Sequence, residues 1–117
     1  MAEQRYVALN GKYMRDAREL LDKGDYPQAS EKLWGVAAQA IKAVAASRRW
    51  RHSSHRDLRT IISRLRQETG DAEYLPLFSA AESLHANFYE DFLAPDDVKF
   101  YAEQVYRLIE KLRPLVS

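Results

Sequence analysis

Residues 48–59 concentrate side chains that can bind an anion or transfer a proton, with five arginines and two of the three histidines. Guanidinium groups bind phosphate through paired hydrogen bonds, and an indole offers a face on which a nucleobase can stack. We therefore expect this segment to bind RNA, single-stranded DNA or a nucleotide. The candidate binding residues are Arg48, Arg49, Trp50, Arg51, His52, His55, Arg56 and Arg59.

The charge is distributed unevenly along the chain. Residues 48–67 carry seven arginines against one acidic residue, Asp57, whereas residues 68–117 carry four basic and ten acidic residues. These segments have net charges of +6 and −6, and the whole chain has +1. Two interpretations stay open. The arginines form an anion-binding surface, or they cap the preceding helix and pair with acidic side chains of the later helices.

A second group of polar side chains lies late in the sequence, within the string LHANFYE. Positions four apart share a helix face, so His85 and Tyr89 are expected to be neighbours, and Asn87 and Glu90 form another pair. Such a set can carry out general acid–base chemistry. It can equally form a buried polar network that fixes how the helices pack. The candidate network residues are His85, Asn87, Tyr89 and Glu90.

Other kinds of site are not supported by the sequence. There is no cysteine, and His52 and His55 lie among arginines that repel a divalent cation, so we predict no metal site. Four glycines do not suffice for a phosphate-binding loop, and no serine has the setting of a nucleophile elbow. We predict no cofactor.

The N-terminal residues are charged every few positions, unlike a signal peptide. No apolar run approaches the roughly 20 residues needed to span a bilayer. We therefore expect a cytoplasmic protein that does not associate with a membrane.

The apolar residues recur at the helical period throughout, and no strand is predicted. The expected fold is all-α, an antiparallel up-and-down bundle of four to five helices that forms one domain over residues 1–117. Asp25 and Ser53 or Ser54 are predicted N-caps, and Gly24 and Gly70 are predicted to end helices. The expected helices cover about residues 3–23, 27–47, 54–69, 72–91 and 95–112.

The helix over 27–47 is predicted to be central, because alanines on several of its sides let more than one neighbour approach closely. Its main apolar stripe consists of Leu33, Val36, Ala37, Ala40, Ile41 and Val44. Trp34 lies off this stripe and is expected to pack against the terminal helix or a second subunit. Surplus aromatic residues of this kind lead us to expect a homodimer.

The strings GDYPQASEKLWGVAAQAIKAVA, SHRDL and LHANFYE together resemble the PaREP family of small archaeal proteins, which belongs to the HEPN superfamily of helical bundles. The resemblance covers residues 15–112. It implies a HEPN-like fold and dimerisation. Many HEPN proteins are ribonucleases or nucleotide-binding partners in toxin–antitoxin and defence systems.

Active HEPN ribonucleases carry an arginine, four to six residues, and then a histidine near the start of a late helix. His85 is a late-helix histidine here, but no arginine precedes it at that spacing. Arg48 or Arg49 with His55 satisfies the spacing, although in the segment between the second and third helices. The resemblance therefore implies four catalytic candidates, namely Arg48, Arg49, His55 and His85.

Three hypotheses for the function follow. The leading one is a HEPN-like homodimer that binds nucleic acid or nucleotide through the arginine-rich segment without robust catalysis. The second is a metal-independent ribonuclease or toxin–antitoxin component. The third is a tetratricopeptide-like module that binds a protein partner, although no 34-residue repeat is visible.

Overall fold

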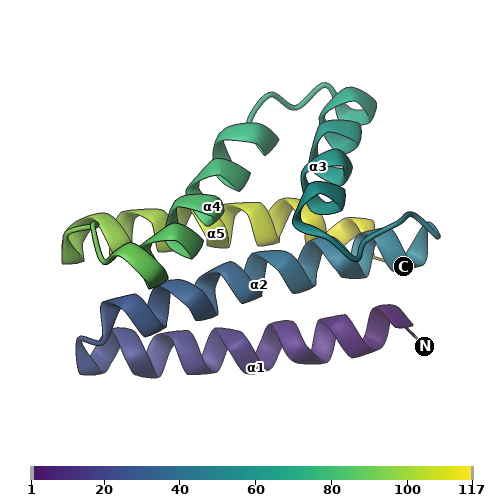
Figure 1. Ribbon diagram of the computed structural model, residues 1–117. Coiled ribbons are helices and arrows are strands. Elements are labelled where there is room, and N and C mark those ends of the chain that lie inside the picture. Colours follow the sequence, from purple (N-terminus) through teal and green to yellow (C-terminus); the bar gives the residue numbers. More distant parts are fainter. Residues whose placement is uncertain (1, 117) are drawn as a thin grey trace.

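The computed structural model describes residues 2–116 and contains five α-helices and one short 3-10 helix (Figure 1). Met1 and Ser117, the ends of the predicted domain, lie outside the described residues. No strand occurs within residues 2–116, and the predicted all-α helical bundle is confirmed. The elements are α1 (Ala2–Lys23), α2 (Tyr26–Ser47), α3 (His55–Thr69), α4 (Tyr74–Glu90), α5 (Pro95–Leu112) and η1 (Arg113–Leu115).

Helices α1 and α2 form an antiparallel hairpin, and α5 runs beside α2 in the same direction (Figure 1). Helices α3 and α4 form a second hairpin that projects steeply from these three. The loop between α2 and α3 lies at the same end of the molecule as the start of α1, whereas the α4–α5 turn lies at the opposite end (Figure 1). We call residues 48–54, which join α2 to α3, the elbow.

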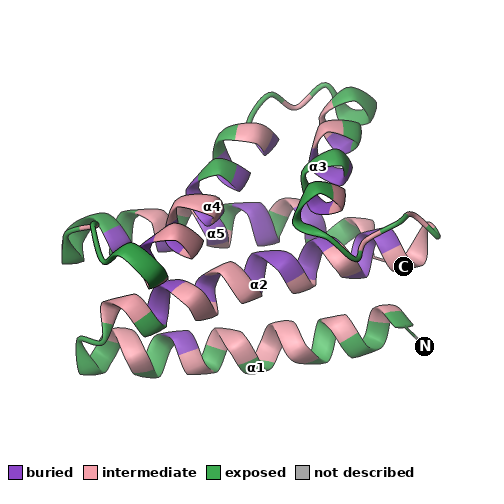
Figure 2. Ribbon diagram, viewed as in Figure 1, coloured by how far each residue is buried: buried purple, intermediate pink, exposed green. Residues whose placement is uncertain are grey.

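Helix α2 is the centre of the fold, as predicted, because it contacts α1, α3, α4 and α5. All six residues of its predicted apolar stripe are buried, and so are Ala38, Ala43 and Ala45 on the adjoining faces (Figure 2). Helix α1 is peripheral, since Ala17 is its only residue classed as buried among those described. It still approaches α2 closely where the Tyr13 ring covers Gly35.

The predicted ends of the helices are largely confirmed. The Asp25 side chain accepts a hydrogen bond from the Gln28 backbone N–H, and Gly70 adopts φ +72° after α3. Helix α4 begins at Tyr74, two residues later than expected. The reason is a turn in which Asp71 Oδ1 accepts a hydrogen bond from the Glu73 N–H at 3.0 Å, which competes with helix formation.

Of the two expectations for Trp34, packing against the terminal helix is corrected by the structure, and packing against a second subunit stays a prediction. The aromatic neighbours of Trp34 are His55 of α3 and Phe78 and His85 of α4, rather than residues of the terminal helix. Trp34 therefore fixes the projecting α3–α4 hairpin to α2. Within residues 2–116, none of the helices is both long and apolar enough to cross a bilayer.

Candidate functional site

The elbow begins with a helix end that usually requires glycine. The Trp50 N–H donates to the Ala45 carbonyl at 2.9 Å and the Arg49 N–H to the Ala46 carbonyl at 3.2 Å, the two bonds of a Schellman motif. The left-handed residue of this motif is Arg49, with φ +61°. A side chain in that conformation costs roughly 1 kcal/mol compared with glycine. The elbow therefore presents an arginine at a position where folding favours glycine.

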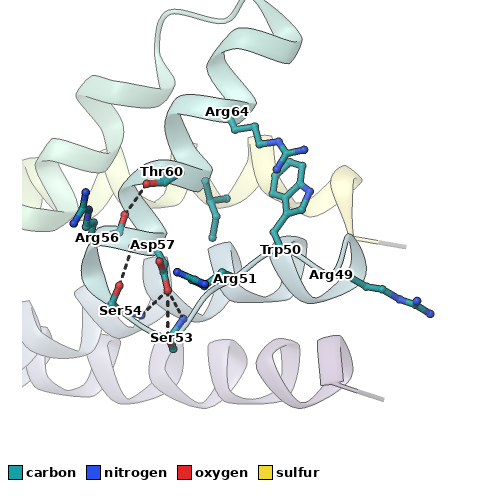
Figure 3. A pocket seen from close by; sticks show the side chains of 10 residues that line it. Arg49, Trp50, Arg51, Ser53, Ser54, Arg56, Asp57, Thr60 and Arg64 are labelled. Carbon is teal, nitrogen blue, oxygen red and sulfur yellow. Dashed lines mark hydrogen bonds between the residues drawn. The ribbon is translucent and has the colours of Figure 1, made fainter.

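Four arginines line an open hollow of about 830 Å³ over the elbow and the first turns of α3 (Figure 3). They are Arg49, Arg51, Arg56 and Arg64, and all four are exposed. Arg64 lies 4.0 Å from Glu68, whereas the other three form no ion pair with another residue of the described chain, 2–116. Arg49 points away from the helices in Figure 3. This part of the predicted surface therefore retains cationic groups that no acidic side chain neutralises.

The other elbow arginine, Arg48, is used structurally. Its guanidinium lies 2.6 Å from Glu68 of α3, and the same carboxylate is 4.0 Å from Arg64. Both guanidiniums lie against the Trp50 ring, at 4.9 Å for Arg48 and 4.0 Å for Arg64. The indole that we expected to stack on a base is thus partly covered by Arg64 (Figure 3). A guanidinium plane can itself stack on a base.

The end of the elbow is fixed by a capping box at the start of α3. Ser54 Oγ accepts from the Asp57 N–H at 3.0 Å, while Asp57 Oδ2 accepts from the Ser54 and Ser53 N–H groups (Figure 3). Desolvation raises the pKa of Asp57, but the hydrogen bonds from both serines together outweigh it and lower that pKa. Asp57, the acidic side chain that lines the hollow, is therefore ionised, and its carboxylate is engaged in hydrogen bonds from backbone N–H groups.

His52 fastens the elbow to α1. Its Nδ1–H donates to the Trp50 carbonyl at 2.7 Å, which leaves Nε2 to accept from the Tyr6 hydroxyl at 3.1 Å. The rings of Tyr6 and His52 also meet edge to face, with centres 5.4 Å apart. His52 therefore holds the elbow against the N-terminal half of α1.

The two other histidines meet on the far side of α3, away from the hollow. His55 begins α3 and His85 lies in α4, and their ring centres are 6.1 Å apart. The Trp34 ring lies 4.9 Å from His55 and stacks on His85 at 4.8 Å. The sequence analysis placed His55 in the arginine-rich segment and His85 in the late polar network, and the structure brings the two together. We call His55, His85 and Trp34 the histidine cluster.

Each imidazole of the cluster donates to a carboxylate. His55 Nε2 lies 2.8 Å from Glu82 and His85 Nδ1 lies 2.7 Å from Glu31. Glu82 also pairs with Arg59 at 2.7 Å. The second nitrogen of each ring, Nδ1 of His55 and Nε2 of His85, is left to accept or donate a proton. Two such groups at this separation suit acid–base catalysis.

The sequence did not indicate Glu31 or Glu82 as site residues. A weak signal was present, because Glu31 lies three residues before Trp34 and Glu82 three before His85, so each pair shares a helix face.

The predicted late polar network divides into two parts. The Tyr89 ring contacts His85 edge to face at 5.6 Å and belongs with the histidine cluster. Asn87 is fully buried between α4 and α2, outside the histidine cluster. Its amide donates to Ser30 Oγ at 3.0 Å, and its carbonyl accepts from the N–H groups of Phe92 and Leu93 at 2.8 Å. Asn87 therefore orders the α4–α5 turn, and Glu90 is exposed.

Within residues 2–116 no group of three or more histidine and carboxylate side chains is placed to hold a metal ion. Fold and site thus define an all-α helical protein with a basic, open elbow and a separate pair of histidines. The chain belongs to the archaeal PaREP1/PaREP8 family, whose model matches residues 5–109. The predicted PaREP membership is confirmed, whereas the wider HEPN relationship stays a prediction.

One solved structure is similar over nearly the whole chain. It is the crystal structure of a protein from Sulfolobus solfataricus, 25% identical, with a TM-score of 0.82. The match covers 93% of this chain and 97% of the other. No curated protein matches this chain.

Proposed function

We propose that this protein binds single-stranded nucleic acid at the elbow. The observation that carries the proposal is the open hollow with three exposed arginines, Arg49, Arg51 and Arg56, which have no acidic partner within residues 2–116. Arginines whose charge is not needed for folding are free to neutralise phosphates. The Arg64–Trp50 stack beside them offers planar groups to a base.

The unfavourable backbone of Arg49 supports the same function. Residues in sparsely populated conformations cluster at functional sites, where binding offsets their cost in folding stability. Here a glycine would satisfy the Schellman motif, but it would remove a guanidinium from the rim of the hollow. The conformation of Arg49 is therefore easier to explain as a feature of binding than as a feature of stability.

The test is binding of a fluorescent single-stranded RNA of about twelve nucleotides, within the range of known single-strand sites. Three neutralised phosphates give a slope of about −2 for log affinity against log salt concentration. Replacing Arg49, Arg51 and Arg56 by Gln should abolish most of the affinity and most of this slope. The control replaces Lys99, Arg107 and Arg113 by Gln, which removes the same charge from the α5–η1 region. Equal losses in both triple variants would contradict a specific site.

A second candidate function, metal-independent RNA cleavage, is favoured by the histidine cluster. In this reaction one neutral imidazole accepts the proton of a ribose 2′-hydroxyl while its oxygen attacks phosphorus. The bond from phosphorus to the 5′-oxygen breaks, and the other, protonated imidazole donates its proton to that oxygen. The products are a 2′,3′-cyclic phosphate and a 5′-hydroxyl. His55 and His85, 6.1 Å apart, supply the two imidazoles.

Cleavage is tested with labelled RNA and with DNA of the same sequence, which lacks the 2′-hydroxyl and should remain intact. The expected pH–rate profile is bell-shaped, because one histidine must be neutral and the other charged. His55→Asn and His85→Asn should each abolish cleavage while RNA binding at the elbow persists. His52→Asn is the control, since His52 lies outside the cluster. Cleavage that survives the double variant would exclude this candidate.

A further inference from the structure

The elbow hollow adjoins a second hollow, and this adjoins a third, along the α1–α2 hairpin. A second hollow, of about 600 Å³, shares Arg49, Trp50, Arg51 and Ser53 with the first. It extends over the start of α1 and the last turns of α2. A third, of about 370 Å³, lies in the groove between α1 and α2 and shares Lys42 with the second. The three hollows therefore adjoin in a row through shared side chains.

One face of α2 forms the floor of this path. Gly35, Gln39, Lys42, Ala46 and Arg49 line the second and third hollows at successive spacings of four, three, four and three residues. Such spacing keeps Gly35, Gln39, Lys42 and Ala46 on one side of α2, and Arg49 follows just past the end of the helix. At 1.5 Å per residue the helical part of the path, from Ala46 to Gly35, is about 17 Å long. The elbow hollow over α3 adds to this length.

Aromatic side chains stand along the same path. Tyr6 lines the second hollow and Tyr13 the third, and because they are seven residues apart they lie on one face of α1. Trp34 lies at the far end of the path, in the third hollow. Cations interspersed with aromatic rings are suited to a single strand, whose bases are free to stack, and not to a duplex.

The charges along the path identify Lys42 as its critical cation. Lys32, farther along, lies 3.6 Å from Asp16 and is partly neutralised. Lys42 lies where the second and third hollows meet, and it forms no ion pair within the described chain. Next to it Gln39 Oε1 is buried and accepts no hydrogen bond from residues 2–116.

From this row of adjoining hollows we infer that the α1–α2 groove is an extension of the elbow site and takes the further nucleotides of the same single strand. The inference rests on the proposed function of the elbow. The strand runs from the arginines over Lys42 to the groove beside Trp34. The combined path accommodates several nucleotides, within the roughly 4–16 that single-strand sites cover.

The experiment measures affinity for single-stranded RNA of increasing length, from about four to about twelve nucleotides. Wild-type protein should bind the longest strand about ten-fold or more tightly than the shortest, whereas a duplex should show no such gain. Lys42→Gln should leave the shortest strand unaffected. For the longest it should lower affinity several-fold and reduce the salt slope by about 0.7, the value of one phosphate. Lys42→Glu should lower the affinity for the longest strand further. Lys99→Gln is the control and should leave this affinity unchanged.

The two proposals fail in different ways. If affinity does not increase with length, or Lys42→Gln has no effect on the longest strand, the extension is wrong, although the elbow site stands. If wild-type protein binds no strand of any length at low salt, the elbow site itself is wrong.

Discussion

His55 and His85 are thirty residues apart in the sequence, yet their ring centres lie 6.1 Å apart, and each ring contacts the indole of Trp34. This contact joins three helices, because Trp34 lies in α2, His55 in α3 and His85 in α4. The aromatic cluster also fixes the angle of the α3–α4 hairpin. The distance between the two imidazoles thus depends on a side chain that is itself chemically inert in acid–base reactions.

Trp34→Ala should therefore affect both stability and the histidine cluster. Truncation of a packed aromatic residue costs roughly 3–5 kcal/mol, and because Trp34 is only half-buried we expect about 2–3 kcal/mol. Urea denaturation measures this loss. Trp34→Phe keeps a ring in place and should cost less than half as much. A loss below about 0.5 kcal/mol for Trp34→Ala would show that the hairpin is held elsewhere.

Local chemistry was enough to predict much of the fold. Asp25, Ser54 and Gly70 mark helix ends through their own side chain or backbone freedom, so their roles do not depend on distant residues. The stripe of α2 follows from helical periodicity alone. These features were all predictable because each is settled within about one or two turns of chain.

Which residues come together in the candidate sites was harder to predict from the sequence. Whether an arginine is paired depends on the position of Glu68 or Glu82, which only the packing of α3 and α4 decides. The meeting of His55 with His85 depends in the same way on the hairpin angle. Asn87 was grouped with Glu90 from helical spacing, but its partners come from Ser30 and the turn after α4.

Asn87→Ala should be strongly destabilising, unlike Glu90→Ala. The Asn87 side chain is fully buried and satisfies Ser30 and the N–H groups of Phe92 and Leu93. Removing it leaves these groups without partners, which costs about 2–3 kcal/mol in total. Glu90 is exposed, so its substitution should change stability by less than about 0.5 kcal/mol. Thermal and urea unfolding measure both, and similar values for the two variants would contradict this assignment.

Two glycine-to-alanine substitutions should change stability in opposite directions. At Gly11 an added Cβ would meet only Arg15 Nη1 at 3.7 Å, so the higher helix propensity of alanine should stabilise the protein by about 0.5–1 kcal/mol. At Gly35 the added Cβ would lie 2.9 Å from the Tyr13 ring and force it away from α2. Overpacking of this kind typically costs about 1–3 kcal/mol and should exceed the gain in propensity. The melting temperatures of the two variants provide the test. Stabilisation by both would show that α1 can move away from α2 at little cost.

The ion cluster at the start of α4 should make stability dependent on pH in a defined direction. Lys111 Nζ lies 2.6 Å from Asp71 and 3.0 Å from Glu73. Its hydrogen bonds are the main cause of the lowered pKa of both carboxyls, and they raise the pKa of Lys111. The carboxylates contribute fully above their unfolded pKa values of about 3.9 and 4.3, and this contribution is lost as pH falls through the lowered folded values. The lysine contributes fully below about pH 10.4 and loses its effect as pH rises through its raised value.

Lys111→Met should accordingly be less stable than wild type at neutral pH. The difference should shrink toward zero as the carboxyls become protonated in acid, and Lys99→Met should show no such pH dependence. Chemical denaturation at a series of pH values measures it. A difference that persists unchanged in strong acid would mean that Lys111 does not act through its charge.

Arg49→Gly should stabilise the protein and weaken its binding of nucleic acid. Glycine adopts the left-handed conformation at φ +61° without strain, so the gain should be roughly 1 kcal/mol. The same change removes one of the three arginines of the elbow hollow that form no ion pair within residues 2–116, so affinity for single-stranded RNA should fall several-fold and the salt slope by about 0.7. Asp91→Gly is the matched control, because Asp91 also has a positive φ, +47°, at the end of α4. It should stabilise to a similar extent without weakening binding. If Arg49→Gly stabilised the protein and left binding unchanged, the strained conformation of Arg49 would have no connection with nucleic acid.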